Sequence, residues 1–298
     1  MDGLRAGGRG APLKGIALVL VSALFFAASS AMAKSVTDAI EISSLQVNFL
    51  RFLVGLVLIA PYAIAKRIPL KPDEPGPVFL RVLSNTAAII LFFIGVKHTS
   101  VTKANMLNMT APVFVFLFAP FINKEKPSPR GYLYLALAMA GVVLTAFRDL
   151  RGVSTGDAVS LASGFMAGIA TSALREARKR DGTFLILFWF YLVSTAVLLL
   201  LMLPGRRPMD AASLAWTLAS GLLGLGGQLT LTAGMGLLDA STGSLVSASR
   251  IIFAGAIGIA FFGDPADAKT LAGGLLILVA LVGVSGFFDR RRRDFQSD

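Results

Sequence analysis

The stretch TKANMLNMTAPVFVFLFAP, residues 102–120, places amide and hydroxyl groups inside an otherwise apolar run. At 100° per residue, one helix face about 120° wide holds Thr102, Asn105, Asn108, Met109 and Pro112. Polar side chains are costly in lipid, so this face contacts another helix or lines a wet cavity. In the cavity interpretation, Pro112 frees a backbone carbonyl at mid-span.

A second stretch carries a matching set of small polar residues. LTAGMGLLDASTGSLVSASRIIFAG, residues 231–255, aligns without gaps with FFIGVKHTSVTKANMLNMTAPVFVF, residues 92–116. In this alignment Ser241 meets Thr102, Ser244 meets Asn105 and Ser247 meets Asn108. The repetition favours a cavity wall, built from both stretches, that binds a polar substrate.

Arg250 lies near the middle of LVSASRIIFAGAIG, inside an apolar run. All 17 Asp and Glu residues map to loops, tails or the ends of apolar runs, so no internal acidic partner is evident. A cation at such depth is destabilised unless it is paired or hydrated. Arg250 therefore grips a substrate carboxylate or phosphate, or it snorkels or bonds carbonyls of a broken helix.

Other polar residues in the apolar runs have weaker assignments. Asn85 and Gln228 are candidate substrate ligands, although interhelical packing is the commoner role for such amides. Residues at the ends of the runs could form a gate or an electropositive mouth, together with Pro112: Lys34, Arg51, His98 and Lys103. For Arg51, snorkelling or loop contact is favoured. The aromatic run 188–191 fits helix packing better than stacking on a planar substrate.

The elements that position these residues are apolar helices. The chain is 55% hydrophobic and 15% charged, with a mean hydropathy of +0.74. Its apolar residues fall into runs of about 20, the length that crosses a bilayer as a helix. We expect an all-α integral membrane protein with ten spans, at about 14–34, 44–65, 77–97, 101–121, 130–147, 156–175, 183–203, 212–236, 241–262 and 269–288.

The distribution of Lys and Arg predicts the orientation. The net charge of +11 comes mainly from short loops between apolar runs, which argues against nucleic-acid binding. Arg81, near the start of the third predicted span, is counted with the cations on the cytoplasmic side. The bias predicts that both termini are cytoplasmic. The AMA at 31–33 resembles a signal-peptide cleavage site, but the charge pattern favours an uncleaved first span.

The order of similar segments predicts two repeats, residues 1–150 and 151–298. RFLVGLVLIAP in the first half is similar to FYLVSTAVLLLLMLP in the second, and AMAGVVLTAF is similar to ALVGVSGFF. Five spans followed by five reverse the second copy in the membrane, which gives an inverted repeat around a central cavity.

The chain resembles the EamA-type branch of the drug/metabolite transporter superfamily. NFLRFLVGL in the second span and GVKHTSVTKANMLNMTAPVFVFLFAPFINKEKPSPRGYLYLALAMAGVVL across the third to fifth carry the resemblance. In the second half, Ile251 replaces the fourth-span proline and Asp264 stands in the loop position of Glu125. The resemblance implies a metabolite carrier of the inner membrane. The first span lacks the glutamate used by small cation-drug exporters of this superfamily.

We therefore expect a secondary transporter for a small polar or anionic metabolite, such as an amino acid or organic acid. It moves this solute across the membrane by alternating access, and the expected direction is export. The alternatives are an exporter of a larger planar metabolite or drug, and a channel-like facilitative carrier. An enzyme, a bound metal and a cofactor are not expected, because the chain has no cysteine, one histidine and no ATP-binding P-loop. The expected partners are the small substrate and lipid, in a monomer or homodimer; the exact substrate and coupling ion stay open.

Overall fold

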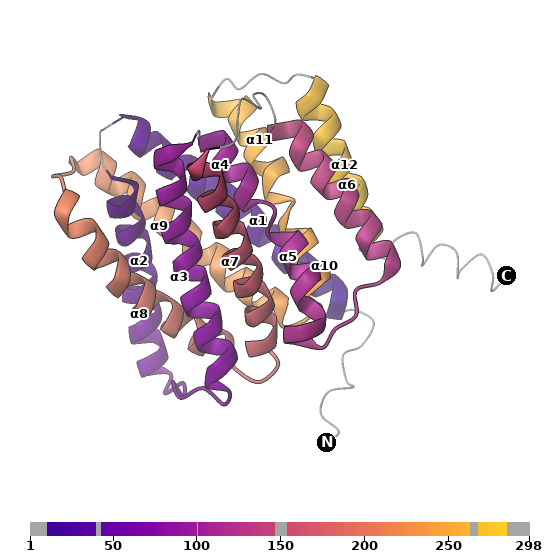
Figure 1. Ribbon diagram of the computed structural model, residues 1–298. Coiled ribbons are helices and arrows are strands. Elements are labelled where there is room, and N and C mark those ends of the chain that lie inside the picture. The colour runs from indigo at the N-terminus through magenta and orange to yellow at the C-terminus, as the bar shows by residue number, and fades with distance from the viewer. Residues whose placement is uncertain (1–10, 40–42, 100, 147–153, 263–267, 285–298) are drawn as a thin grey trace.

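The computed structural model describes residues 11–39, 43–99, 101–146, 154–262 and 268–284, and every regular element in these ranges is helical (Figure 1). This confirms the expected all-α class for the described part of the chain. The helices are α1 (Ala11–Ala39), α2 (Ser44–Ala65), α3 (Pro75–His98), α4 (Val101–Asn108), α5 (Ala111–Phe118), the π-helical turn η1 (Ala119–Asn123), α6 (Pro129–Ala146), α7 (Thr155–Ala177), α8 (Thr183–Met202), the 3₁₀ turn η2 (Leu203–Gly205), α9 (Ala211–Met235), α10 (Ala240–Ser247), α11 (Arg250–Phe262) and α12 (Ala268–Val284).

Seven apolar segments of the described residues are long enough to cross a bilayer. They are Ala11–Ala33, Ser44–Ala65, Pro75–Val96, Thr155–Ala177, Thr183–Gly205, Ala211–Met235 and Ala240–Phe261. Three shorter apolar helices, Ala111–Asn123, Pro129–Leu144 and Leu271–Gly283, lie where the sequence predicts further spans. These lengths define a multi-pass integral membrane protein.

Polar residues at the helix ends explain where the apolar helices begin. Ser154 and Asp157 form a capping box at the start of α7, with N–H to oxygen distances of 2.9 and 3.2 Å. Asp210 caps α9, and Asp239 caps α10 by accepting a 2.7 Å bond from the Thr242 N–H. Such caps satisfy the free N–H groups of a first turn. These acidic residues therefore lie at the starts of the apolar helices and not in their interiors.

The helices pack as long neighbouring pairs. α3 lies along α7, and α1 lies along α9. α6 lies along α12 at one edge of the bundle, and α2 lies along α8 towards the other (Figure 1). Each of these pairs joins one helix from the first half of the chain to one from the second half, so the two halves are packed into a single bundle.

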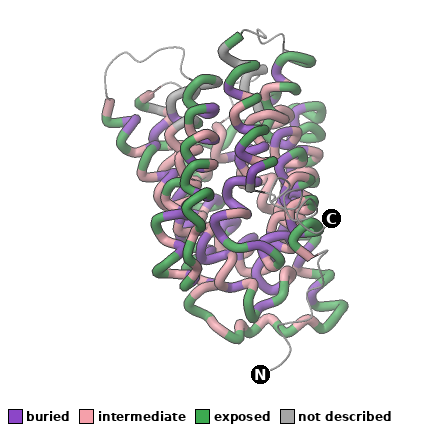
Figure 2. The backbone as a smooth tube through the Cα atoms, turned by 90° about the vertical axis from the view of Figure 1, so that its right-hand side faces the viewer, coloured by how far each residue is buried: buried purple, intermediate pink, exposed green. Residues whose placement is uncertain are grey.

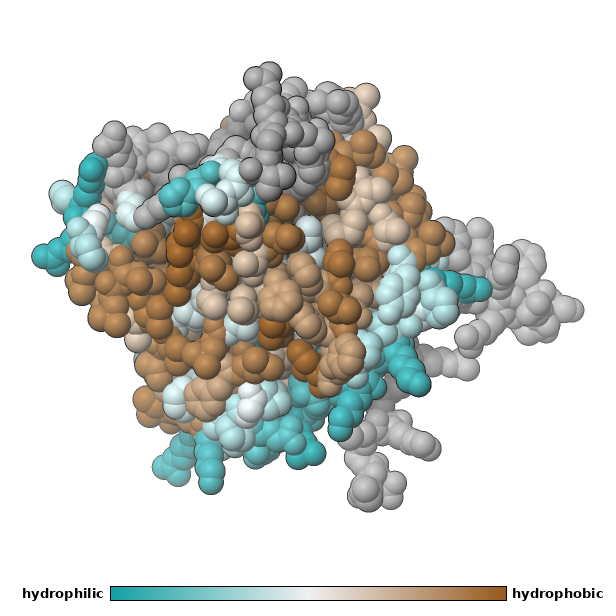
Figure 3. Space-filling view, in the orientation of Figure 1, coloured by the Kyte–Doolittle hydropathy of each residue, from teal (hydrophilic) through white to brown (hydrophobic). Residues whose placement is uncertain are grey.

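The outer faces of the bundle are apolar. Buried residues gather between the helices and exposed ones line their outer sides (Figure 2). Figure 3 shows a broad hydrophobic surface with hydrophilic residues along its lower edge. Large side chains on such faces include Phe121 and Phe261, which are 76% and 80% exposed. An exposed apolar surface of this extent is suited to contact with lipid.

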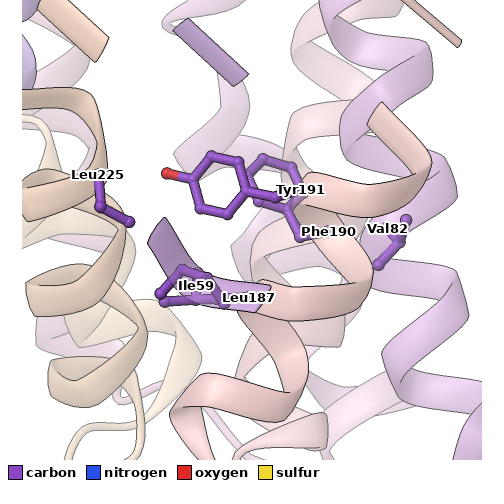
Figure 4. Packing of buried hydrophobic residues seen from close by; sticks show 6 residues of the cluster. All are labelled: Ile59, Val82, Leu187, Phe190, Tyr191 and Leu225. Atoms are coloured by element: carbon purple, nitrogen blue, oxygen red, sulfur yellow. The ribbon is translucent and has the colours of Figure 1, made fainter. Parts of the chain in front are cut away.

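One buried cluster joins α2, α3, α8 and α9: Ile59, Val82, Leu187, Phe190, Tyr191 and Leu225 (Figure 4). Phe190 is 1% exposed within it, and the Trp189 Nε1–H donates to the Leu70 carbonyl at 2.8 Å. The run 188–191 therefore serves helix packing, the role favoured by its sequence.

Glycines of α7 allow α4 and α5 to approach closely. A Cβ atom on Gly164 would lie 2.6 Å from the Leu107 carbonyl oxygen, and one on Gly168 would lie 2.5 Å from Cβ of Phe114. Both distances are shorter than any ordinary contact, so only glycine fits these positions without movement.

Gly164→Ala is expected to destabilise the protein by about 1–3 kcal/mol, because the added methyl group pushes a backbone carbonyl away from α7. Thermal unfolding in detergent measures the effect. Gly274→Ala is the matched control, because a Cβ at this helical glycine meets nothing within 4 Å. Equal melting temperatures for the two variants would contradict the close contact of α7 with α4 and α5.

Candidate functional site

The helical stretches α4–α5 and α10–α11 are interrupted at equivalent points of the aligned halves. α4 ends at Asn108 and α5 begins at Ala111, while α10 ends at Ser247 and α11 begins at Arg250. At each interruption a backbone N–H donates to the carbonyl three residues earlier. The N to O distance is 3.3 Å from Thr110 to Leu107 and 3.1 Å from Ser249 to Val246. Such tight turns expose backbone groups where a regular helix would not.

Proline is not the common cause of the two interruptions. Pro112 lies at the start of α5 and removes the donor that would bond the Asn108 carbonyl. That oxygen faces α7, 3.2 Å from where a Cβ of Gly164 would lie. In the second half, Ile251 occupies the place of the proline and the helix is interrupted nevertheless.

The amides of the fourth span have different surroundings. The Asn108 amide donates to Ser163 Oγ at 2.7 Å, and Ser163 donates to the Ala88 carbonyl at 2.9 Å. Asn108 thus links α4 to α7 and, through Ser163, to α3, which is an interhelical packing role. Asn105 is exposed. The side chain of Thr102 lies outside the described residues.

The hydroxyls of the ninth span bond their own helix. Ser244 Oγ donates to the Ser241 carbonyl at 2.9 Å, and Ser247 Oγ donates to the Gly243 carbonyl at 2.8 Å. Because each hydroxyl has one hydrogen, both side chains are left with acceptor capacity only. Ser244 is buried, and Ser247 is half-buried.

Arg250 begins α11 at the second interruption. Its guanidinium is enclosed by protein, yet part of the side chain surface stays accessible. It makes no hydrogen bond or ion pair with any residue in the described ranges.

Arg51 turns inward from α2 rather than snorkelling to the membrane surface. Its Nη2 donates to Ser29 Oγ at 2.8 Å and its Nη1 donates to Asn48 Oδ1 at 3.1 Å. Ser29 is fully buried on α1 and is bonded to Ser220 of α9. The Arg51 guanidinium also interacts electrostatically with Arg250.

Arg81, which the charge pattern counts with the cations on the cytoplasmic side, is buried. It is 4% exposed inside α3, because this helix starts at Pro75 and Arg81 already lies in its second turn. Nη1 donates to Asn85 Oδ1 at 2.8 Å, and Nη2 donates to Gln228 Oε1 at 3.4 Å. Its Cζ lies 5.2 Å from the centroid of the Phe190 ring. Asn85 and Gln228, predicted as substrate ligands, thus hold Arg81.

Tyr191 lies between these cations. Its ring packs on Gly55 of α2, where a Cβ atom would lie 2.1 Å from the Tyr191 ring. Figure 4 shows the hydroxyl pointing away from Phe190, towards the helix that carries Leu225. Tyr191 interacts electrostatically with Arg51 and Arg81, and its O–H has no hydrogen-bond partner within the described ranges.

The predicted mouth is described only in part. His98 ends α3 and is exposed. The side chains of Lys34 and Lys103 lie outside the described residues, so the structure does not test their role. Pro112 lies at the start of α5, at the interruption between α4 and α5.

A polar network closes the end of the bundle that carries Glu125. Glu125 Oε1 accepts a 2.9 Å bond from Arg175 Nε, and Oε2 accepts a 2.7 Å bond from the Ala240 N–H. Arg175 also donates to the carbonyls of Met235 and Gly236 at 3.4 and 3.3 Å. We call this set of contacts the Glu125 latch. It ties the loop before α6 to α7 and to the α9–α10 turn.

The arginines near the latch are crowded. Burial lowers the pKa of Arg178, the neighbouring Arg175 lowers it further, and Asp181 acts in the opposite direction. Arg178 Nε donates to the Thr232 carbonyl at 3.0 Å. Arg175 is therefore held by Glu125 and by backbone carbonyls, and Arg178 is held by a backbone carbonyl. These bonds fix α7 against the end of α9.

A bundle of apolar helices of spanning length defines the class of this protein as a multi-pass membrane protein. The class is confirmed by comparison: the profile of the EamA-like transporter family matches residues 13–147 and 154–286. The chain belongs to this family and is a membrane transporter.

Named relatives are distant. The chain is 26% identical over 275 residues to the pseudopaline exporter CntI of Pseudomonas aeruginosa, covering 91% of this chain and 95% of the relative. It is 27% identical over 302 residues to solute carrier family 35 member G1 of Mus musculus, covering 92% and 79%. A solved crystal structure has a TM-score of 0.76 at 18% identity, covering 95% of this chain and 98% of the other, which supports the fold alone.

Proposed function

We propose that this protein is a secondary transporter that moves a small polar or anionic metabolite across the inner membrane by alternating access. The observation that carries the proposal is Arg250, a deep guanidinium with no hydrogen bond or ion pair in the described ranges. A substrate carboxylate or phosphate would supply the missing partner through two parallel hydrogen bonds.

The proposed architecture is ten spans in two inverted five-helix repeats, residues 1–150 and 151–298, with both termini in the cytoplasm. The packing supports it, because α3 pairs with α7 and α1 pairs with α9, a pattern that is preserved when the two halves are exchanged. The interruptions before α5 and α11 support it further. An inverted repeat places the substrate near the middle of the membrane, between the halves.

Export is the proposed direction. It is supported by the name of one relative, which is an exporter of pseudopaline. The substrate of this chain is argued from its own residues instead, since relatives of about 26% identity share a fold more readily than a ligand.

The test is counterflow in proteoliposomes. We expect uptake of a labelled amino acid or organic acid to saturate with concentration and to accelerate when the same unlabelled solute is inside. Uptake that stays proportional to concentration, with no acceleration, would identify a channel-like carrier. If counterflow is seen only with large planar compounds, the small-metabolite proposal is wrong and the protein is an exporter of a larger planar metabolite or drug.

A further inference from the structure

Two of the buried arginines approach neighbouring turns of α9. Nη2 of Arg51 lies 3.8 Å from the place that a Cβ of Gly224 would occupy, and Nη2 of Arg81 lies 3.4 Å from Gln228 Oε1. Residues four apart share a helix face, with side chains about 5–6 Å apart. The two guanidiniums therefore lie beside neighbouring turns of α9.

Tyr191 and Arg250 complete the group. The hydroxyl of Tyr191 interacts electrostatically with both Arg51 and Arg81, and Arg51 interacts with Arg250. The four side chains come from α2, α3, α8 and α11, and α9 runs beside them. We call them the arginine cluster.

No acidic side chain in the described ranges neutralises the arginine cluster. Its hydrogen-bond acceptors are the neutral oxygens of Ser29, Asn48, Asn85 and Gln228. Uncompensated cations inside a membrane protein are unfavourable, and Arg51 and Arg250 also repel one another. Neutral side chains would pack these helices at lower free energy, so packing alone does not account for the cluster.

The cluster retains unused donors. A guanidinium has five N–H groups. Arg51 and Arg81 each use two in protein hydrogen bonds, and Arg250 uses none within the described ranges. Arg81 is also fixed over the Phe190 ring. The free donors of Arg51, Arg250 and the Tyr191 hydroxyl suffice for two bidentate anionic groups.

We propose that the arginine cluster binds a small polyanion, a solute with at least two carboxylate or phosphate groups about one helical turn apart. This inference rests on the proposed function and narrows its substrate class. A monoanion would leave two cations without a counter-charge, and a cationic solute would be repelled. In this assignment, Arg51 and Arg250 contact the bound polyanion directly. Arg81 stays bound to protein groups and adds positive electrostatic potential to the site.

The first experiment compares ligands by thermal unfolding of the purified protein at constant ionic strength. The probes are acetate, glutarate and tricarballylate, with one, two and three carboxylates, and glutaramide is the neutral control. Each added carboxylate is expected to lower the apparent Kd at least about tenfold, because it gains charge-assisted hydrogen bonds. Glycerol 3-phosphate tests whether the site prefers a phosphate or a carboxylate group. If it stabilises the protein more than glutarate does, the site binds a phosphate group.

The second experiment supplies the counter-charge from the protein. Gln228→Glu places a carboxylate beside Arg81 without removing any arginine. We expect the Kd for tricarballylate to rise at least about tenfold, while the melting temperature without ligand stays equal or increases. Ala212→Glu is the matched control, because it adds the same charge at an exposed position in the first turn of α9.

The outcomes separate this inference from the transport proposal. The polyanion assignment is overturned if acetate or glutaramide stabilises the protein as well as tricarballylate does, if none of the anions stabilises it, or if Gln228→Glu binds tricarballylate unchanged. Counterflow of a neutral or cationic solute would also overturn it and leave transport intact. Tight tricarballylate binding without counterflow of any solute would uphold the site and refute the transport proposal.

Discussion

Replacing Arg250 with glutamine is expected to lower transport about thirtyfold or more. Loss of a buried charge-assisted contact with a substrate anion costs about 2–5 kcal/mol, which corresponds to at least about thirtyfold in affinity. The stability of the empty protein should change in the opposite direction. Arg250 has no protein partner in the described ranges, so removing its charge relieves an uncompensated buried cation.

Counterflow in proteoliposomes and thermal unfolding of the ligand-free protein measure these two effects. Arg250→Lys keeps the charge but loses the planar pair of donors, and we expect an intermediate transport rate. Arg206→Gln is the control at an exposed arginine between α8 and α9. A folded Arg250→Gln protein that transports at the normal rate would remove Arg250 from the substrate site.

The apolar helices were predictable because hydrophobic runs of spanning length are a strong local signal. Seven of them are confirmed at nearly the predicted bounds. The interruption near Pro112 was also predictable, since proline removes a backbone donor. The interruption before Arg250 has no proline and depends on packing between helices, so the sequence alone gives no local reason for it.

Arg81 shows why a site is harder to predict than a span. A cation near the end of an apolar run is usually interfacial, and this expectation counted Arg81 with the cations on the cytoplasmic side. Its burial depends on Gln228 and Phe190, which are more than 100 residues away in the chain. The one local signal was Asn85, four residues later on the same helix face.

The amides were predicted as a class but not by role. Asn85, Asn108 and Gln228 bond protein groups, so they hold helices and Arg81 in place. Sequence spacing identifies the face on which an amide lies. It does not identify the partner, because partners come from other helices, and the direct substrate contacts of every candidate remain a proposal.

Glu125→Gln is expected to open the end of the bundle closed by the Glu125 latch. The substitution weakens the bonds to Arg175 and to the Ala240 N–H. Both side chains of the ion pair are about a fifth exposed, so we discount the loss to about 2 kcal/mol. In a two-state alternation this shifts the equilibrium about thirtyfold towards the state open at the latch.

The absence of cysteine from the chain allows this shift to be measured without background. Ser244→Cys places a thiol at a position 4% exposed in α10, one turn from the latch, and a hydrophilic maleimide reports its accessibility in detergent. Glu125→Gln should raise the labelling rate about thirtyfold. Glu74→Gln is the matched control, because the Glu74–Arg180 pair at 2.6 Å is largely exposed and contributes little. Equal labelling in the two variants would show that the Glu125 latch does not hold the closed state, whereas a rise confined to Glu125→Gln makes this carboxylate the point at which the two halves separate.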